Sequence, residues 1–455
     1  MRDRFSNRLG FILISAGCAI GIGNVWRFPY IVGQYGGAAF VLIYLFFLVI
    51  LGLPVMVMEY SVGRASQKSA ALSFDVLEPK GTKWHFMKYV AMAGNYILMM
   101  FYTSVCGWLF YYFYKMLIGD FNGLNVGQIN NEFGLMLSNP LIQVGMMFLV
   151  VCIGFFICSK GLQNGVEKVS KYMMLSLLAL MLVLAVRSLI LPGAMEGVKF
   201  YLLPDFSKMQ NVSDVVFAAM GQAFFSMSLG MGCLSTYASY FGKETRLGHT
   251  AMSVGLIDTC VAVLAGLIIF PAAFSVGIQP DAGPSLIFIT LPNVFQQAFA
   301  NVPFLAYICS VAFYVLLALA ALTSTISLHE VSTAFLHEKF HFTRGRAACI
   351  VTGGCLLIGV VSSLALGEWS SVKIGGLNMF DALDYLTAKI MLPVCGMFAA
   401  VFVGWVLDKS IVKGEVTNYG MLKAPYYPVY LIVLKFVAPI GILAIFINEL
   451  GLLSW

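Results

Sequence analysis

The sequence predicts an all-α polytopic membrane protein, and two observations carry this prediction. First, 60% of the 455 residues are hydrophobic and only 11% are charged, with a mean hydropathy of +0.88, whereas soluble proteins have about 25% charged residues. Second, the apolar residues fall in eleven blocks, each long enough to cross a ~30 Å hydrocarbon core as a helix. A β-barrel would instead show alternation over about ten residues. The composition also excludes a cytosolic enzyme, a disordered chain and a secreted disulfide scaffold.

The first block follows the short head MRDRFSNR, which has no small-residue cleavage site, so we interpret it as a retained helix. The ten cysteines stand singly within apolar blocks, as small buried hydrophobes do, and none has the spacing of a metal site. We expect membrane spans at residues 9–34, 38–62, 87–117, 141–158, 169–191, 213–240, 246–276, 303–336, 346–366, 378–407 and 427–450.

Lys and Arg residues are concentrated in alternate connections between the spans. They precede the first span and follow the second, fourth, sixth, eighth and tenth, whereas connections 119–140 and 277–302 contain none. Because cytoplasmic connections are enriched in basic residues, we expect segment 1–8 and connection 408–426 to be cytoplasmic. With eleven spans, the tail that ends at Trp455 is then extracellular.

Two spans are interrupted near mid-membrane by glycines. The first contains AGCAIGIGN (residues 16–24), and the sixth contains FFSMSLGMGC (residues 224–233). A single glycine in a membrane helix usually serves helix packing. Broken helices at corresponding positions of two halves instead indicate an inverted-repeat transporter with a binding site at the membrane midplane. We therefore expect a first repeat at 9–191, an extracellular loop at 192–212, a second repeat at 213–407, and an added helix and tail at 427–455.

Hydroxyl side chains accompany these breaks. Ser226 and Ser228 lie in the sixth span, and ALTSTIS (residues 321–327) lies in the eighth. Unwound backbone inside a membrane must be satisfied by polar partners, and a hard cation such as Na⁺ prefers oxygen ligands. Small hydroxyl residues also occur in helix packing, but their coincidence with two breaks favours ion ligands.

Of the charged residues within or beside apolar spans, where charge is costly and commonly functional, four are singled out here as candidates: Arg27, Glu59, Asp258 and Asp384. Asp258 lies in GLIDTCVAVLAG with no neighbouring cation in the sequence. Arg27 and Asp384 could form an ion pair on the outer side, or both could extend to the interface. Glu59 could cap freed amides or pair with a cation at the cytoplasmic edge.

His337 and His341 with Glu338 have the spacing of a helical metal pair, but they fall among basic residues at a helix end, where we favour a solvated cluster. The sequence contains no phosphate-binding P-loop, G-x-S-x-G or H-E-x-x-H motif. Neither ATP-driven transport nor enzymatic hydrolysis is therefore indicated.

Long motifs identify a resemblance that covers essentially the whole chain. RLGFILISAGCAIGIGNVWRFPY, GQYGGAAFVLIYLFFLVILGLPVMVMEYSVGR, GQAFFSMSLGMGCLSTYASY and ALTSTISLHE resemble the neurotransmitter:sodium symporter family. Eleven spans are typical of its bacterial members, and the resemblance is nearest to those that carry several hydrophobic amino acids. It implies the LeuT fold, with five-plus-five inverted repeats, one extra helix, and location in a bacterial inner membrane.

The resemblance implies two Na⁺ sites and one amino-acid site. The first Na⁺ site would comprise Ala19, Asn24, Ser226 and Asp258. The second would comprise Gly17, Ile20, Ala320, Thr323 and Ser324. The residues implied for substrate binding are Cys18, Ala19, Ile22, Gly23, Leu98, Tyr102, Phe225, Ser226, Ser228, Met231, Ser324 and Leu328.

The same comparison implies two gates. The outer gate would pair Arg27 with Asp384, or with Asp381, and Tyr102 and Phe225 would close the lid. The inner gate would pair Arg2 with Glu338, supported by Tyr240. Stretch 277–302 would plug the outer vestibule.

Two departures from the family pattern have consequences. Chloride-dependent relatives have Asn where this chain has Asp258, and Ser where it has Ala262. The Asp258 charge, beside Tyr44, Gln222 and Ser226, would replace chloride. In the fifth span, Leu175 stands ten residues after Gly165, where several relatives have a proline associated with release of the second Na⁺.

We therefore expect a chloride-independent symporter that imports neutral hydrophobic L-amino acids, with aromatic ones among the candidates, together with two Na⁺ ions and without a nucleic-acid partner. One alternative is a Na⁺-coupled carrier of an amine or another zwitterion. Amine carriers place an acidic residue in the first break, whereas residues 9–23 contain neither Asp nor Glu. A non-transporting membrane receptor is the alternative from another class.

Overall fold

The described helices follow the stretches in which membrane spans are expected from the sequence. A computed structural model describes residues 4–5, 8–209, 211–277, 288–289, 291–298 and 302–452. Over these residues, nine helical runs are long and apolar enough to cross a membrane, and a bent pair, Arg8–Ala19 and Gly23–Gln34, makes a tenth. The shorter apolar helix Val212–Ser226 and the helix that follows it occupy the sixth expected span.

The first five spans are built from ten helical segments. In order they are α1 (Arg8–Ala19), η1 (Gly23–Arg27) and α2 (Phe28–Gln34); α3 (Ala38–Phe47), η2 (Leu48–Gly52) and α4 (Leu53–Ser66); α6 (Met87–Leu117); α8 (Pro140–Ser159); and η4 (Leu162–Glu167) with α9 (Lys168–Leu189). Their connections contain α5 (Ala70–Leu77), η3 (Trp84–Phe86) and α7 (Val126–Ser138).

The remaining spans follow the same plan. They are α11 (Val212–Ser226) with α12 (Cys233–Ala238); α13 (Leu247–Ser275); α15 (Pro303–Phe340); α16 (Arg344–Leu364); α17 (Met379–Asp384), η7 (Tyr385–Met391), α18 (Leu392–Val401) and η8 (Phe402–Val406); and α20 (Tyr427–Ile432), η9 (Val433–Val437) and α21 (Ala438–Glu449). Connections contain α10 (Ala194–Leu202), η5 (Phe206–Lys208), α14 (Leu291–Ala298), β1 (Lys373–Ile374), β2 (Leu377–Asn378) and α19 (Lys409–Val416).

Both predicted breaks are present. The first span is interrupted after Ala19 and bends by 58° before it continues at Gly23. The sixth is interrupted between Ser226 and Cys233, and Gly230 and Gly232 in this gap have φ values of 83° and 76°. Only glycine adopts this left-handed region without steric cost, so the glycine pattern of the sequence encodes the break directly.

Several features of the helices are not evident in the sequence pattern. π-helical turns (η1, η2, η4, η7, η8 and η9) interrupt spans 1, 2, 5, 10 and 11. The loops expected at 192–212 and 408–426 contain helices α10 and α19. Strands β1 and β2 form a two-stranded antiparallel hairpin in which Lys373 pairs with Asn378, and Gly375 and Gly376, both at positive φ, make its turn.

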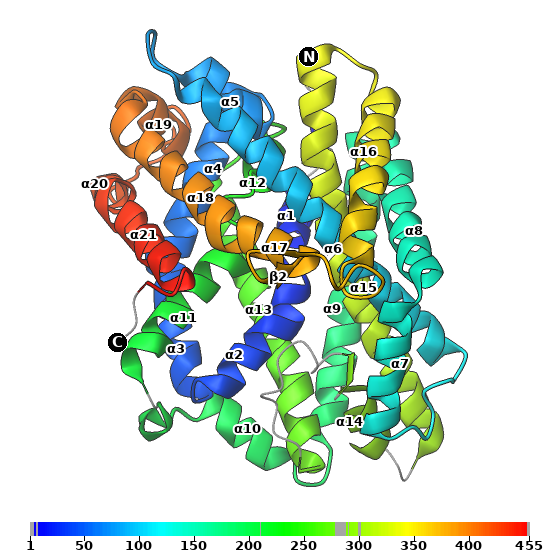
Figure 1. Cartoon of the computed structure of the whole chain (residues 1–455). Helices are drawn as coiled ribbons and strands as arrows, with labels where there is room; N and C mark the ends of the chain where they lie inside the picture. The colour runs from blue at the N-terminus through cyan, green and yellow to red at the C-terminus, as the bar shows by residue number, and fades with distance from the viewer. Residues whose placement is uncertain are drawn as a thin grey trace.

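The connections divide between the two ends of the helix bundle. Helices α5 and α19, which lie in connections expected to be cytoplasmic, stand at one end in Figure 1, and α10 and α14 stand at the other. This arrangement fits the alternation of basic and non-basic connections in the sequence. The end with α5 and α19 is called the inner end below, following the prediction.

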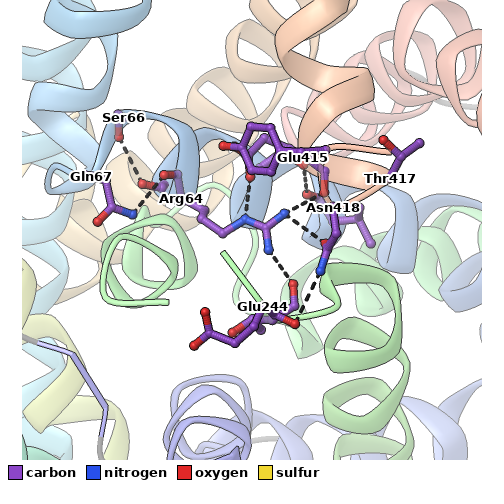
Figure 2. A network of polar contacts seen from close by, with 12 residues as sticks. Arg64, Ser66, Gln67, Glu244, Glu415, Thr417 and Asn418 are labelled. Atoms are coloured by element: carbon purple, nitrogen blue, oxygen red, sulfur yellow. Dashed lines mark hydrogen bonds and ion pairs between the residues drawn. The ribbon is translucent and has the colours of Figure 1, made fainter. Parts of the chain in front are cut away.

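A buried ion pair joins three elements at the inner end. Arg64, in the last turn of α4, pairs with Glu415 of α19, and their side chains are 1% and 2% exposed. Arg64 also donates to the backbone oxygens of Thr245 and Glu415 and to the side chain of Asn418. Figure 2 shows the guanidinium enclosed by these acceptors. Because the charge is both paired and fully hydrogen-bonded, its burial is tolerated.

The approach of α4 to α12 depends on the absence of a side chain at Gly63. A Cβ atom there would lie 1.9 Å from the carbonyl oxygen of Ser235, whereas a Cβ at Gly353, in α16, would have no neighbour within 4 Å. We expect Gly63→Ala to destabilise the protein by about 1–3 kcal/mol, because the two helices must separate. Gly353→Ala is the matched control and is expected to be neutral or slightly stabilising, because Ala favours helix.

Thermal unfolding of the two purified variants in detergent tests this expectation. Equal midpoints for Gly63→Ala and Gly353→Ala would show that the contact between α4 and α12 does not limit stability.

Candidate functional site

A cavity of about 480 Å³ begins at the two helix breaks. Eleven of the twelve residues expected to bind substrate line it, from Ala19 and Ile22 in the first span to Leu328 in the eighth. Its further walls are largely aromatic and reach the outer end of the bundle through Trp108, Phe133 and Phe288. Phe288 belongs to the predicted plug stretch 277–302, most of which lies outside the described residues.

Three of the four residues expected at the first Na⁺ site form one hydrogen-bonded cluster. Asn24 Nδ2 donates to Asp258 Oδ1 at 2.7 Å and to Ser226 Oγ at 3.2 Å, and Ser226 Oγ donates to Asp258 Oδ2 at 2.6 Å. Asp258 is fully buried and Asn24 is 1% exposed. The fourth residue, Ala19, lines the same cavity as Asn24 and Ser226.

The other polar side chains near Asp258 are uncharged. Tyr44 Oη lies 3.3 Å from Ser226 Oγ, and the buried side chain of Gln222 lines the cavity. Among the described residues, no Lys or Arg nitrogen lies within 4 Å of the Asp258 carboxylate. A buried carboxylate without a cation is costly, so this cluster is suited to receive a monovalent cation from solution.

The residues expected at the second Na⁺ site also lie together. Thr323 Oγ1 donates to the carbonyl oxygen of Ala320 at 2.9 Å and lies 3.5 Å from that of Ile20. A Cβ atom at Gly17 would lie 3.5 Å from Cβ of Thr323. Ser324, the next residue, faces the cavity beside Gly21. The break thus brings backbone carbonyls of the first span against hydroxyls of the eighth.

Side chains satisfy the backbone groups that the breaks release. The amide of Gly21 donates to Asn24 Oδ1 at 3.3 Å, and that of Ile22 donates to Tyr102 Oη at 3.4 Å. In the sixth span, the Gly230 amide donates to Glu59 Oε1 at 2.7 Å. Of the two roles considered for Glu59, the structure therefore shows the capping role.

Cys18 does not lie where it was expected. Its side chain is 3% exposed and is not among the residues that line the cavity. Its carbonyl oxygen instead accepts a hydrogen bond of 3.0 Å from Ser228 Oγ, which ties the two breaks together. The helical end of α1 turns the Cys18 side chain away from the break, toward Cys233 of α12.

The outer gate differs from its expected pairing. Arg27 lies 3.6 Å from Glu449, at the end of α21, and its guanidinium stands 4.7 Å above the ring of Phe225. Asp384 and Asp381 both line the cavity, as Arg27 does, but neither forms an ion pair with Arg27 within 4 Å. Because the cavity is continuous between these side chains, the predicted Arg27–Asp384 pair is open in this structure.

At the inner end, the expected and observed contacts differ in part. Arg2 lies outside the described residues. The carboxylate of Glu338 accepts a hydrogen bond of 2.9 Å from the backbone amide of Ser69. Tyr240 Oη, expected to support that pair, donates to Glu330 Oε1 at 2.9 Å. Glu330 is fully buried and also pairs with Arg344 of α16.

Glu330 and Arg344 were not singled out from the sequence as functional residues. The available signal was a carboxylate at the end of the hydroxyl-rich stretch ALTSTISLHE. Its neighbour in the sequence is His329. In the structure His329 lies against the hydroxyls of Thr333 and Thr352, within the interface of α15 and α16.

The fifth span begins with the π-helical segment η4, which contains Gly165. A Cβ atom at Gly165 would lie 1.9 Å from the carbonyl oxygen of Ile157, so the glycine permits a close contact with α8. Leu175, at the position where the resemblance implies a proline, is 44% exposed on the outside of α9. The irregular backbone of this span therefore lies at Gly165 and not at Leu175.

Comparison with known proteins agrees with this geometry. The model of the sodium:neurotransmitter symporter family matches residues 2–133 and 124–453. An uncharacterized sodium-dependent transporter, YhdH of Bacillus subtilis, is 34% identical, with 99% of this chain and 98% of the relative covered. An uncharacterized sodium-dependent transporter of Haemophilus influenzae is 35% identical, and the match again covers 99% of this chain and 98% of the relative.

A solved structure shows the same fold. The crystal structure of MhsT in complex with L-phenylalanine matches with a TM-score of 0.87 and 37% identity, covering 99% of this chain and 100% of that one. The family match spans nearly the whole sequence, and the fold carries both broken helices of the predicted LeuT architecture. The chain therefore belongs to the sodium:neurotransmitter symporter family and is a multi-pass, sodium-dependent transporter.

Proposed function

We propose that the protein imports a neutral L-amino acid with a large apolar or aromatic side chain, coupled to two Na⁺ ions and without a chloride requirement. The membrane is that of a bacterial cell, with the N-terminus cytoplasmic and the C-terminus extracellular. Transport proceeds by alternating access, in which spans 1, 2, 6 and 7 rock against the others.

The observation that carries this proposal is the buried carboxylate of Asp258, which lies behind the cavity-lining residues Asn24 and Ser226. Its hydrogen-bond donors, Asn24 and Ser226, are both neutral. A fixed negative charge in this position balances an entering Na⁺ by itself, so a second anion is not needed. Tyr44 and Gln222 complete a polar cluster in which Asp258 supplies the charge that chloride supplies in the chloride-dependent relatives.

The chemistry of the cavity supports a substrate that is charged at one end and apolar at the other. The polar end contains the Ile22 amide and the Tyr102 hydroxyl, which suit a carboxylate, and the carbonyls of the sixth-span break suit an ammonium. Leu98, Met231 and Leu328 form an apolar wall. Met is flexible and adapts to side chains of different shape, and the relative MhsT was crystallised with L-phenylalanine.

The first test is uptake of labelled L-phenylalanine and L-leucine into proteoliposomes. We expect accumulation that follows an inward Na⁺ gradient and is unchanged when gluconate replaces chloride. Accumulation without Na⁺ would refute the coupling mechanism, and loss of uptake in gluconate would refute chloride independence.

The second test removes the Asp258 charge. We expect Asp258→Asn to reduce Na⁺-dependent uptake at least about tenfold, because one charge in a buried site contributes 1.4 kcal/mol or more. Added chloride is expected to restore part of the uptake. Asp120→Asn, at an exposed site that pairs with Lys115, is the control and should transport normally. Full activity of Asp258→Asn in gluconate would exclude the proposed role of Asp258.

The third test concerns substrate size. Met231→Phe places a rigid ring in the apolar wall of the cavity. We expect kcat/KM for L-phenylalanine to fall by about 10-fold to 100-fold relative to that for L-alanine, because the variant lacks room for a second aromatic ring. Met421→Phe, at an exposed site, is the control. Equal changes in kcat/KM for both substrates would show that Met231 does not determine specificity for substrate size.

A further inference from the structure

Glu449, near the C-terminus, faces two cations at the outer end of the cavity. Its Oε1 lies 3.6 Å from Arg27 Nη2, and its Oε2 lies 3.6 Å from Lys389 Nζ. The three residues come from η1, η7 and α21, so the first, tenth and eleventh spans meet at this carboxylate. The side chain of Glu449 is 22% exposed, against 37% for Arg27 and 39% for Lys389.

Arg27 thus has acidic side chains on two sides, one outside the cavity lining and two within it. Asp384 and Asp381 line the cavity, whereas Glu449 is not among its lining residues. Asp384 lies near enough to Arg27, Lys389 and Glu449 for its charge to interact with each of them. Arg27 therefore has one carboxylate behind it, on the eleventh span, and others across the cavity, on the tenth.

The position of Arg27 is coupled to the cavity through Phe225. The guanidinium stands 4.7 Å above the centre of the Phe225 ring, and that ring lines the cavity between the two breaks. A movement of Arg27 toward Asp384 would cross the outer part of the cavity and carry its charge over the same ring. The contact with Glu449 holds Arg27 away from that path.

We propose that Glu449 is a positioning residue of the outer gate, which holds Arg27 in the open state and releases it to Asp384 when the cavity closes. Lys389 remains beside Glu449 when Arg27 leaves, so the carboxylate keeps a cationic partner in both states. The distances of 3.6 Å suit this exchange, because they are too long for strong hydrogen bonds and can break at small cost. The inference extends the proposed function by giving the eleventh span a role in gating.

The test measures how readily the cavity is reached from solution. Val105, which lines the cavity, is replaced by Cys, and the rate of its reaction with a charged methanethiosulfonate reagent is measured on the purified full chain in Na⁺ buffer. The chain without Val105→Cys supplies the background from the native cysteines. Each rate is measured without substrate and again with L-phenylalanine at the concentration that halves the rate of the Val105→Cys chain.

We expect Glu449→Gln to slow the reaction about twofold to fivefold in the presence of L-phenylalanine, because loss of one partly exposed ion pair favours the closed state by that factor. Asp384→Asn should have the opposite effect. Glu132→Gln is the matched control, because Glu132 lies 3.7 Å from Lys115 in a comparable pair away from the gate.

Combination with Arg27→Gln separates gating from a general structural effect. In the Arg27→Gln background, Glu449→Gln should no longer change the rate, because the group that it positions is absent. An unchanged rate in the single variant, or an equal slowing in both backgrounds, would overturn the proposal. If L-phenylalanine protects none of the variants, the proposed substrate class fails, and the measurements without substrate still decide the role of Glu449.

Discussion

The constraint on which this structure depends is that backbone polar groups inside a membrane need partners. A continuous helix satisfies them internally, but the breaks in the first and sixth spans release amides and carbonyls in a low-dielectric environment. Each of four side chains forms a hydrogen bond with one of the released backbone groups: Asn24, Tyr102, Ser228 and Glu59. The polar side chains of the core are therefore placed where the helices are interrupted, and the cavity forms at the same place.

The breaks also explain how distant parts of the chain meet. Asn24 and Asp258 are separated by 234 residues, yet the turn after α1 brings the amide of Asn24 to within 2.7 Å of the carboxylate. Thr323 reaches the carbonyl of Ile20 across 303 residues for the same reason. Straight helices would direct these side chains along parallel faces, whereas two interrupted helices allow them to converge on a small volume.

Local signals in the sequence predicted much of this arrangement. Apolar blocks predicted the spans, and the glycines of AGCAIGIGN and FFSMSLGMGC predicted the breaks. In the sixth span the structure gives the reason, because Gly230 and Gly232 adopt a positive φ, which glycine permits. The hydroxyls near the breaks predicted candidate ion ligands. The resemblance to a family then implied which residues form the substrate site and the two Na⁺ sites. The structure brings these residues to the cavity or to the polar groups beside it, except for the side chain of Cys18.

The features that could not be predicted depend on tertiary contacts. No periodicity marks the π-helical turns, because a π turn differs from an α turn by one inserted residue. Glu449 stands at the end of an apolar span, where a charged residue usually faces the interface, and only the packing of α21 beside η1 and η7 brings it to Arg27. Glu330 was not predicted as a functional residue, because its partners, Tyr240 and Arg344, come from other spans.

The ion pair of Arg64 and Glu415 has a consequence for how the protein is made. The two residues are separated by 351 positions, so at about 5–20 residues per second the ribosome needs about 20–70 s to synthesise Glu415 after Arg64. During that interval Arg64 cannot yet form this ion pair. The burial shown in Figure 2 is therefore a late event of assembly, which joins the second span and the connection between the sixth and seventh to a segment translated nearly last.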